Sequence, residues 1–192
     1  MTAALKLPTG QAAVLADALG ALVPVIETTR LRLRAPRLAD YPAYETVFVS
    51  QRSVHIGGPF GAEDAFKDFC QAVAGWMLRG AGAWTITAKG ADAPLGWIYL
   101  WHEFGDPEPE FGWLLTAAAE GHGYASEAAR AVLPRALEIY GAGGVVSYID
   151  AANHRSARIA SDLGARRDLV AEAALGEAGL QVYRHHAPKE PS

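Results

Sequence analysis

The residues with the clearest chemical potential form a glycine-rich hexapeptide, Glu120–Ala125 (E-G-H-G-Y-A), where a helical pattern begins. Two glycines one residue apart allow a tight turn and keep side chains away from an approaching ligand. The free N–H groups of Gly121 through Ala125 then point out of the positive end of a helix, which is a natural site for a pyrophosphate. The alternative is a turn that only connects two elements.

Two other phosphate-binding patterns fit this loop less well. A dinucleotide-binding loop would carry a third glycine where Ser126 stands, and no acidic residue ends a following strand at the required distance. The mononucleotide-binding pattern G-x-x-x-x-G-K-[ST] does not occur in the sequence. The hypothesis that the protein is a nucleotide-dependent enzyme is therefore remote.

Hydrophobic periodicity predicts the elements that must position the loop. Apolar alternation and short apolar runs predict strands over Leu31–Ala35, Trp84–Ala88, Leu95–His102, Glu110–Leu115, Val145–Asp150 and Val182–His186. Apolar residues three or four apart predict helices over Gln11–Leu22, Asp40–Phe48, Glu63–Arg79, Tyr124–Tyr140 and Asn153–Leu163. From Leu31 onward the order is β-α-α-β-β-β-α-β-α-β, which predicts a mixed α/β sheet with helices packed on it.

Turn and cap residues refine these boundaries. Asp40 and Asn153 are expected to cap the helices that follow them, and Gly164 is expected to end the second of those helices. The segment Gln51–Gly61 is dense in turn residues and is predicted to be a loop. Pro134 is expected to kink or weaken its helix.

Composition excludes several classes of protein. Of 192 residues, 51% are apolar and 20% are charged, which predicts a folded domain with a sizeable core. A net charge of −4 without a basic cluster gives no reason to expect nucleic acid or an anionic membrane as partner. The single cysteine, Cys70, cannot form an internal disulfide, which favours the cytoplasm. No Cys/His spacing suits a metal, so we predict no metal.

The two ends of the chain are predicted to lie outside the main domain. Residues 1–27 form an N-terminal extension with a possible short helix; Lys6 is its only early cation and Asp17 interrupts its apolar run, which argues against a secretory signal. Residues 28–187 form the domain, and residues 188–192 are predicted to be a flexible tail.

Taken in order, four segments resemble the GNAT superfamily of acyl-CoA-dependent N-acyltransferases, and in particular its ribosomal-protein N-terminal acetyltransferase (RimJ/RimL-like) branch. The resemblance covers residues 28–186. Its segments are Thr28–Pro36 (T-T-R-L-R-L-R-A-P), Pro109–Thr116 (P-E-F-G-W-L-L-T), Glu120–Ala128 (E-G-H-G-Y-A-S-E-A) and Asn153–Ala165 (N-H-R-S-A-R-I-A-S-D-L-G-A).

The resemblance implies a GNAT-like α/β (α+β) fold: a mixed, mostly antiparallel central sheet with helices on both faces. The parallel strands Glu110–Leu115 and Val145–Asp150 would splay apart, and the pantetheine arm of acetyl-CoA, the cosubstrate, would enter the gap. The implied acetyl-CoA ligands are Leu114, Leu115 and Thr116 on the strand, Glu120, Gly121, His122, Gly123, Tyr124, Ala125 and Ser126 around the pyrophosphate, and Asn153 and Ser156 beside the pantetheine.

Two positions depart from the family pattern. Ala118 stands where many members carry an Arg or Gln that helps to hold the phosphates, and Ala160 stands where many carry a Tyr that protonates the leaving thiolate. These departures motivate an alternative from another class, a catalytically inactive CoA-binding or sensor module.

Acetyl transfer to an amine requires removal of a proton, because an amine arrives mostly as ammonium near neutral pH. Glu110, at the start of the central strand, is our first candidate for the general base. The alternative interpretation is that Glu110 is an ordinary solvated residue of the hairpin without a catalytic role. His102 and Glu103 are second choices. A thiol has a pKa of about 8.5, so the thiolate leaves without a strong acid, and water or Ser156 would supply its proton.

Three residues are candidates for binding the acceptor: His55 in the Gly-rich loop, Trp101 and Glu103. Trp97, Tyr99 and Trp101 share one face of their strand. We expect this face to pack in the core, with the exception of Trp101, which lies near the end of the strand. The sequence therefore predicts an acetyl-CoA-dependent N-acetyltransferase acting on a primary amine, either a protein N-terminus or a small molecule. A homodimer is an open alternative to a monomer.

Overall fold

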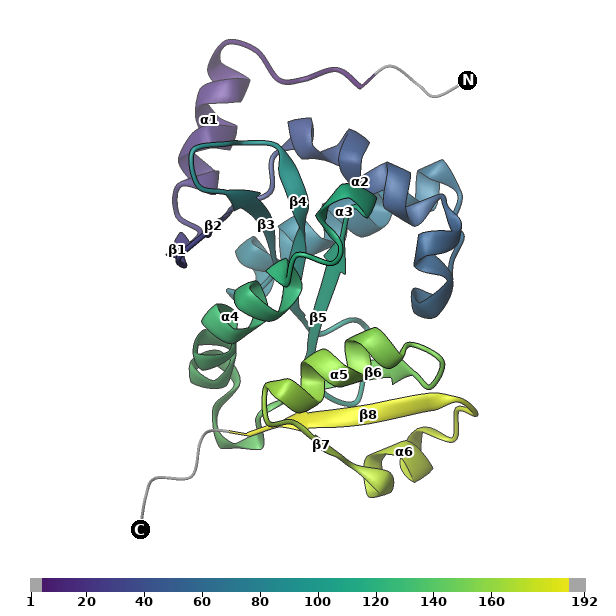
Figure 1. Ribbon diagram of the computed structural model, residues 1–192. Helices are drawn as coiled ribbons and strands as arrows, with labels where there is room; N and C mark the ends of the chain where they lie inside the picture. Colours follow the sequence, from purple (N-terminus) through teal and green to yellow (C-terminus); the bar gives the residue numbers. More distant parts are fainter. Residues whose placement is uncertain (1–4, 187–192) are drawn as a thin grey trace.

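The computed structural model describes residues 5–186, which build one eight-stranded sheet with helices on both faces (Figure 1). The strands are β1 (Ile26–Glu27), β2 (Leu31–Arg34), β3 (Ala83–Ala88), β4 (Pro94–Trp101), β5 (Glu110–Leu115), β6 (Val145–Asp150), β7 (Arg166–Arg167) and β8 (Leu180–His185). Their order across the sheet is β1-β2-β3-β4-β5-β6-β8-β7. Every neighbouring pair is antiparallel except β5 and β6, which are parallel, so the expected fold class is confirmed.

Helices occupy the connections between the strands. They are α1 (Gln11–Gly20), α2 (Tyr41–Phe48), α3 (Ala62–Arg79), α4 (Tyr124–Tyr140), α5 (His154–Asp162) and α6 (Leu169–Leu175), with the short 3-10 segments η1 (Leu38–Asp40), η2 (Gln51–Ile56), η3 (Ala117–Ala119) and η4 (Gly141–Gly143). Each of the five predicted helices is present within a few residues of its expected bounds.

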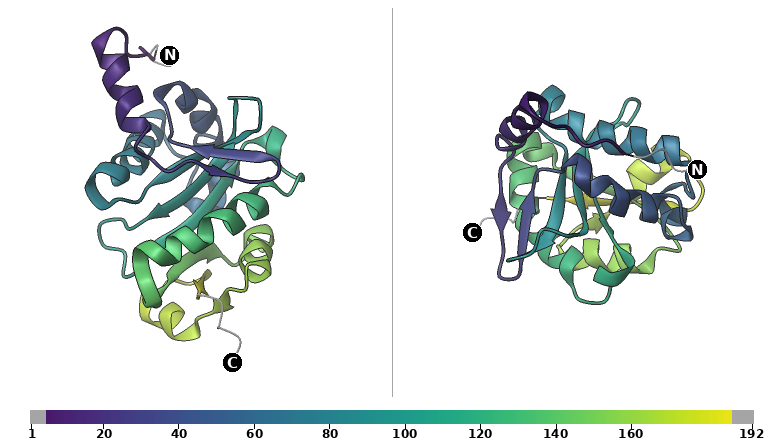
Figure 2. Two further views of the ribbon diagram at one scale, coloured as in Figure 1. Left: turned by 90° about the vertical axis from the view of Figure 1, so that its left-hand side faces the viewer. Right: turned by 90° about the horizontal axis from the view of Figure 1, so that it is seen from above.

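Two hydrophobic cores form because the central strands β3 and β4 bury side chains on both faces of the sheet. On one face, Phe111 and the Ala128–Val132 side of α4 belong to the larger core. On the other face, Tyr44 of α2, Phe69 of α3 and Trp97 of β4 form a core rich in aromatic rings. Figure 2 shows α4 lying across one face of the sheet, with α2 and α3 on the opposite face.

Several short elements depart from the sequence expectation. The predicted loop Gln51–Gly61 begins with the 3-10 segment η2, and β7 and α6 fill the stretch after α5. Ile26 and Glu27, expected in the extension, pair with β2. Helix α1 is present as predicted, but it contains no buried residue. The predicted tail at 188–192 lies outside the described residues.

Asp40 precedes α2 as expected, but its carboxylate does not cap that helix. It accepts hydrogen bonds from the Arg34 guanidinium at 2.8 and 2.9 Å, from the Arg37 main-chain N–H at 2.9 Å and from the Thr85 hydroxyl at 2.9 Å. The side chains of Arg34 and Asp40 are only 5% and 4% exposed. A buried charge pair, rather than a helix cap, therefore fastens the start of α2 to β2 and β3.

We predict that Asp40→Ala lowers the free energy of unfolding by about 3–5 kcal/mol, because it leaves the buried Arg34 guanidinium without its main counter-charge. Urea unfolding monitored by circular dichroism measures the change. The matched control is Asp92→Ala, which also removes a carboxylate bonded to Arg34, but one whose side chain is 67% exposed. A loss for Asp40→Ala no larger than for Asp92→Ala would contradict the structural role of the buried pair.

Candidate functional site

The central feature of the site is a gap between β5 and β6. The two strands share one aligned residue pair, Glu110 and Val146, where the Val146 N–H donates to the Pro109 carbonyl at 3.0 Å. Beyond this point the strands diverge, and a cavity of about 1100 Å³ opens between them. The segments η2, α4 and α5 also contribute to its walls.

Main-chain groups of β5 point into this gap at alternate residues. The Phe111 carbonyl faces β6, since it accepts a hydrogen bond from the Ser147 hydroxyl, so by alternation the main-chain groups of Trp113 and Leu115 face the gap. The Thr116 N–H instead donates to the Leu95 carbonyl beside β4 at 2.9 Å. Of the three strand positions expected to bind pantetheine, Leu115 is directed to the gap, whereas Leu114 and Thr116 direct their main chains toward β4.

The glycine-rich loop leads into α4 at one side of the cavity. Gly121 and Gly123 have φ values of 79° and 75°, a backbone region that favours glycine. Within residues 5–186, the main-chain N–H groups from Gly121 to Ser126 donate to no protein acceptor. Gly121 and the residues from Gly123 to Ser126 line the cavity. The unpaired amides and the positive end of a helix that spans Tyr124–Tyr140 fit the diphosphate of a ligand such as CoA.

Arg30 holds this loop from outside the cavity. Its guanidinium donates to the His122 carbonyl at 3.0 Å and to the Glu127 carboxylate at 2.6 Å, and it lies 4.9 Å from the centre of the Tyr124 ring. Glu127 also accepts a hydrogen bond from the Thr28 hydroxyl. Sequence reasoning missed Arg30 as a support of the loop; the Arg before β2 and the Glu in the first turn of α4 are individually ordinary surface residues.

Two arginines bring positive charge to the same part of the cavity. The Glu120 carboxylate pairs with Arg52 of η2 and, at 2.8 Å, with Arg155 of α5. The Glu120 side chain thus holds two guanidinium groups at the start of the loop. Neither arginine was among the predicted site residues, since they lie far apart in the sequence and only the fold brings them together.

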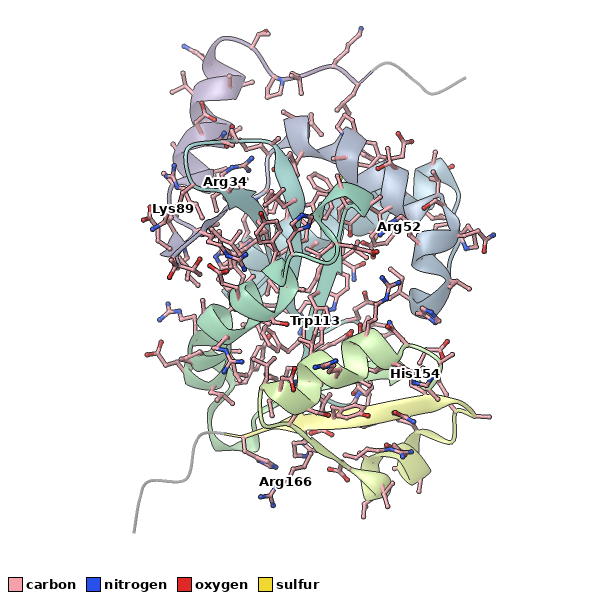
Figure 3. All side chains as sticks on the ribbon, viewed as in Figure 1. Arg34, Arg52, Lys89, Trp113, His154 and Arg166 are labelled. Atoms are coloured by element: carbon pink, nitrogen blue, oxygen red, sulfur yellow. The ribbon has the colours of Figure 1, made fainter. Side chains whose placement is uncertain are left out.

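Helix α5 supplies the wall opposite the loop. The Asn153 side chain accepts a hydrogen bond from the Ser156 N–H at 3.2 Å, which confirms Asn153 as the helix cap. The Ser156 hydroxyl accepts a hydrogen bond from the Trp113 indole N–H at 3.3 Å. Figure 3 shows Trp113 at the centre of the molecule, near the ribbons of α4 and α5. Asn153, Ser156 and Trp113 all line the cavity.

Glu110 lies where the two strands separate, on the face of the sheet that carries α2 and α3. Its carboxylate accepts a hydrogen bond from the Trp101 indole N–H at 3.3 Å. Burial raises the pKa of Glu110 to about 7; the Trp101 hydrogen bond opposes this rise, and the negative charges of Asp106, Glu103 and Asp68 add to it. A carboxyl group with this pKa is able to exchange a proton near neutral pH.

The remaining predicted residues are divided between the cavity and its surroundings. His55, Trp101 and Glu103 line the cavity, and the His55 ring lies 3.3 Å from the Asp150 carboxylate. The walls of the cavity do not include His102, Thr116 or His122. The His102 ring contacts the Asp106 carbonyl at 2.8 Å, and the His122 ring contacts the Glu120 carbonyl at 2.8 Å. His102 is therefore a weaker candidate for the base than Glu110.

The aromatic trio of β4 is partly core, as expected. Trp97 is fully buried and Tyr99 is 6% exposed, whereas Trp101 is half-buried. The Tyr99 and Trp101 rings also line the cavity, with their centres 5.1 Å apart.

Among residues 5–186, no group of three or more His, Cys, Asp or Glu side chains is arranged to hold a metal ion. The helices of this same part of the chain include none that combines the length and the apolar character needed to cross a membrane.

The fold and this geometry fit a protein that holds a phosphate-bearing cosubstrate across a split sheet. The sequence profile of the acetyltransferase (GNAT) domain matches residues 30–166 of the chain. A curated relative, the uncharacterized N-acetyltransferase YnaD of Bacillus subtilis (strain 168), is 30% identical over 145 residues, which are 74% of this chain and 83% of that protein. The chain thus belongs to the GNAT family of N-acetyltransferases, whose members use acetyl-CoA.

Solved structures agree with this family. An acetyltransferase from Agrobacterium tumefaciens str. C58 superposes with a TM-score of 0.78 at 36% identity and covers 86% of this chain and 95% of its own. RimL, a ribosomal L7/L12 alpha-N-protein acetyltransferase solved in complex with coenzyme A, superposes with a TM-score of 0.65 at 15% identity over 85% of this chain and 98% of its own. At that identity the likeness is one of fold alone.

We predict that Gly123→Asp abolishes binding of acetyl-CoA, because it places a carboxylate beside the amides that face the diphosphate. Isothermal titration calorimetry measures the affinity. Gly123→Asn carries the same backbone strain without the charge and should weaken binding less. Gly90→Asp, at a turn glycine with a φ of 80° and open space around it, is the control for strain. Unchanged affinity in Gly123→Asp would refute the loop as the phosphate site.

Proposed function

We propose that this protein transfers the acetyl group of acetyl-CoA directly to a primary amine, with Glu110 as the general base. The observation that carries this proposal is the position of Glu110, a carboxyl group with a pKa of about 7, at the point where β5 and β6 separate. The same cavity contains the unpaired amides at the start of α4. Binding groups and a proton acceptor thus share one space.

The cosubstrate would be held by groups of three kinds. The amides from Gly121 to Ser126 would bind the diphosphate, and the guanidinium groups of Arg52 and Arg155 would add positive charge beside it. The main-chain groups of Trp113 and Leu115, left without a partner strand, would bind the pantetheine arm, with Asn153 and Ser156 on the opposite wall. When bound, acetyl-CoA supplies an acetyl group activated as a thioester.

Glu110 would remove the proton from the incoming ammonium, either directly or through a water molecule. A primary amine has a pKa of about 10, so only a small fraction is uncharged at neutral pH. A base with a pKa near the working pH combines a useful ionised fraction with sufficient proton affinity. The ordinary pKa of a glutamate, about 4.3, would make it a much weaker proton acceptor.

Ser156 is the residue nearest in role to the tyrosine that Ala160 replaces. Its hydroxyl oxygen accepts a hydrogen bond from Trp113, which leaves its own proton free for donation into the cavity. Ala160 of α5 is fully buried, and its side chain carries no proton to donate. We therefore assign proton delivery to the leaving sulfur either to Ser156 or to water.

Other aspects of the function follow from the same proposal. Arg52 and Arg155 supply positive charge close to the loop. The absence of an Arg or Gln at position 118, where this chain has Ala118, is therefore a weaker argument for a catalytically inactive CoA-binding module. A RimJ/RimL-like role would make a protein N-terminus the acceptor; the likeness to RimL supports it only through the fold. A cytoplasmic location and a homodimer remain predictions.

Release of free CoA in the presence of a panel of amines tests for turnover, and binding of acetyl-CoA without release of CoA would favour the inactive module.

We predict that Glu110→Gln lowers kcat/KM for amine acetylation by about 100-fold, within the range of general-base catalysis, and leaves the Kd of acetyl-CoA unchanged. In the wild type, kcat/KM should rise with pH until Glu110 is ionised, at a pH of about 7, and this limb should be missing in the variant. Initial rates of CoA release between pH 5.5 and 9 measure both. A variant that retains the wild-type rate and pH profile would exclude Glu110 as the base.

A second prediction concerns stability and is independent of activity. Because burial raises the pKa of Glu110 in the folded state above its unfolded value, ionisation of Glu110 opposes folding as the pH rises from about 4.3 to about 7. Glu110→Gln removes this penalty. Its Tm should equal that of the wild type near pH 4.5 and exceed it at pH 8. Two Tm curves that stay parallel across this range would show that the pKa is not raised.

A further inference from the structure

Charge is segregated within the cavity. At the end where the cosubstrate would bind, the cavity is lined by Arg52 and Arg155, whose guanidinium groups pair with Glu120 just before the Gly121–Ser126 loop. At the other end, which we name the acidic end, the cavity is lined by four half-buried carboxyl groups: Asp68 of α3, Glu103 and Asp106 of the β4–β5 loop, and Glu110.

The carboxyl groups at the acidic end lack counter-charges within the protein. Glu120 at the phosphate end pairs with two arginines, and Asp150 lies beside His55. Within residues 5–186, by contrast, neither lysine nor arginine lies in ion-pair contact with Asp68, Glu103, Asp106 or Glu110. Burial without a counter-charge disfavours ionisation, and it raises the pKa of Asp68, Glu103 and Glu110.

A second observation at this end concerns Tyr99. Its hydroxyl group is buried and has no hydrogen-bond partner in the described part of the chain, although its residue lines the cavity and is 6% exposed. The neighbouring Trp101 ring also lines the cavity and offers an aromatic face. An unpaired buried hydroxyl costs about 1–3 kcal/mol, which a ligand with N–H donors would recover. Carboxylates, a phenol oxygen and an indole face are together suited to a cationic ligand.

The reacting amine alone cannot supply the missing positive charge. It must lose a proton before it attacks, and the amide that it forms is neutral. Asp68 accepts a hydrogen bond from the Tyr44 hydroxyl and Asp106 accepts one from the Glu103 N–H at 2.9 Å, but neither bond supplies a positive charge. A monoamine would therefore leave three carboxyl groups beside Glu110 without a counter-charge throughout the reaction. A second cationic group in the same molecule keeps its charge from binding through product formation.

We propose that the acetyl acceptor carries, besides the primary amine that reacts, a second positively charged group, which Asp68, Glu103 and Asp106 bind at the acidic end of the cavity. This inference rests on the proposed function, because the position of Glu110, the proposed base, indicates where the reacting amine binds. Tyr99 and Trp101 would accept the remaining donors of the cation. A small diamine and a peptide with a basic side chain near its N-terminus both have this chemistry.

The first test compares acceptors that differ only in the second charge. The diamine putrescine and its monoamine counterpart butylamine form one pair, and two short peptides with lysine or glutamine after an N-terminal alanine form the other. We expect kcat/KM for the dicationic member of at least one pair to be at least about tenfold higher, and the advantage to shrink as salt is added. Preference within either pair supports the proposal and assigns the source of the charge; equal values within both pairs overturn it.

The second test assigns the preference to named residues. Asp106→Asn and Glu103→Gln keep side-chain shape and should each reduce the ratio of kcat/KM between the two members of the preferred pair by about tenfold. The matched control is Asp64→Asn, which removes a carboxylate from α3 at an exposed position one turn before Asp68 and should preserve the ratio. An unchanged ratio in both cavity variants would contradict the assignment.

Calorimetry separates failure of this inference from failure of the proposed function. Putrescine titrated into the protein in the absence of acetyl-CoA should bind more tightly than butylamine, and Asp106→Asn should remove the difference. If no amine is acetylated but this difference is found, the proposed catalytic role fails and the cationic site stands. If amines are acetylated and Glu110→Gln slows the reaction but no difference in binding or rate is found, only the inference fails.

Discussion

The structure depends on a constraint at the centre of its sheet: β5 and β6 run parallel but share a single aligned residue pair, Glu110 and Val146. Unpaired main-chain groups are costly when they are buried, so a sheet that opens at its middle needs either water or a ligand to complete the hydrogen bonds of Trp113 and Leu115. The start of α4 presents the same need, since its first amides have no protein acceptor in the described chain. Both sets of groups open into one cavity, which is why this fold suits an extended, phosphate-bearing cosubstrate.

Much of this arrangement could be predicted from the sequence because it depends on local patterns. Apolar alternation located the long strands, a spacing of three or four residues located α3 and α4, and the E-G-H-G-Y-A loop marked the helix start. The two-residue strands β1 and β7 could not be predicted, because they are defined by their pairing with β2 and β8. The seven-residue helix α6, which packs against β8, is too short to show a clear apolar period. Asp40 shows the same limit: its position agrees with a cap, but tertiary contact with Arg34 and Thr85 determines what its carboxylate binds.

The candidate site follows the same division. The loop and the Asn153 cap are local, so they appear in the sequence as motifs. The arginines that bring charge to the loop come from η2 and α5, more than a hundred residues apart, and no spacing rule connects Arg52 with Arg155. The direction of the β5 main-chain groups was also beyond prediction, because it is set by the register in which β5 pairs with β4. The expectation for Leu114 and Thr116 rests on the family resemblance alone, and the register with β4 turns their main-chain groups toward that strand.

The effect of the acidic end on Glu110 changes when a cationic ligand binds there. In the protein alone, burial and then the charges of Asp106, Glu103 and Asp68 raise the pKa of Glu110. A bound second cation would neutralise part of that negative charge and favour the ionised carboxylate. The acidic end would then do more than select the acceptor: occupancy by the proposed dication would itself make Glu110 available as a base at neutral pH. A monoamine would bring no second cation to offset those charges, so acceptor recognition and proton removal would be linked through the same carboxyl groups.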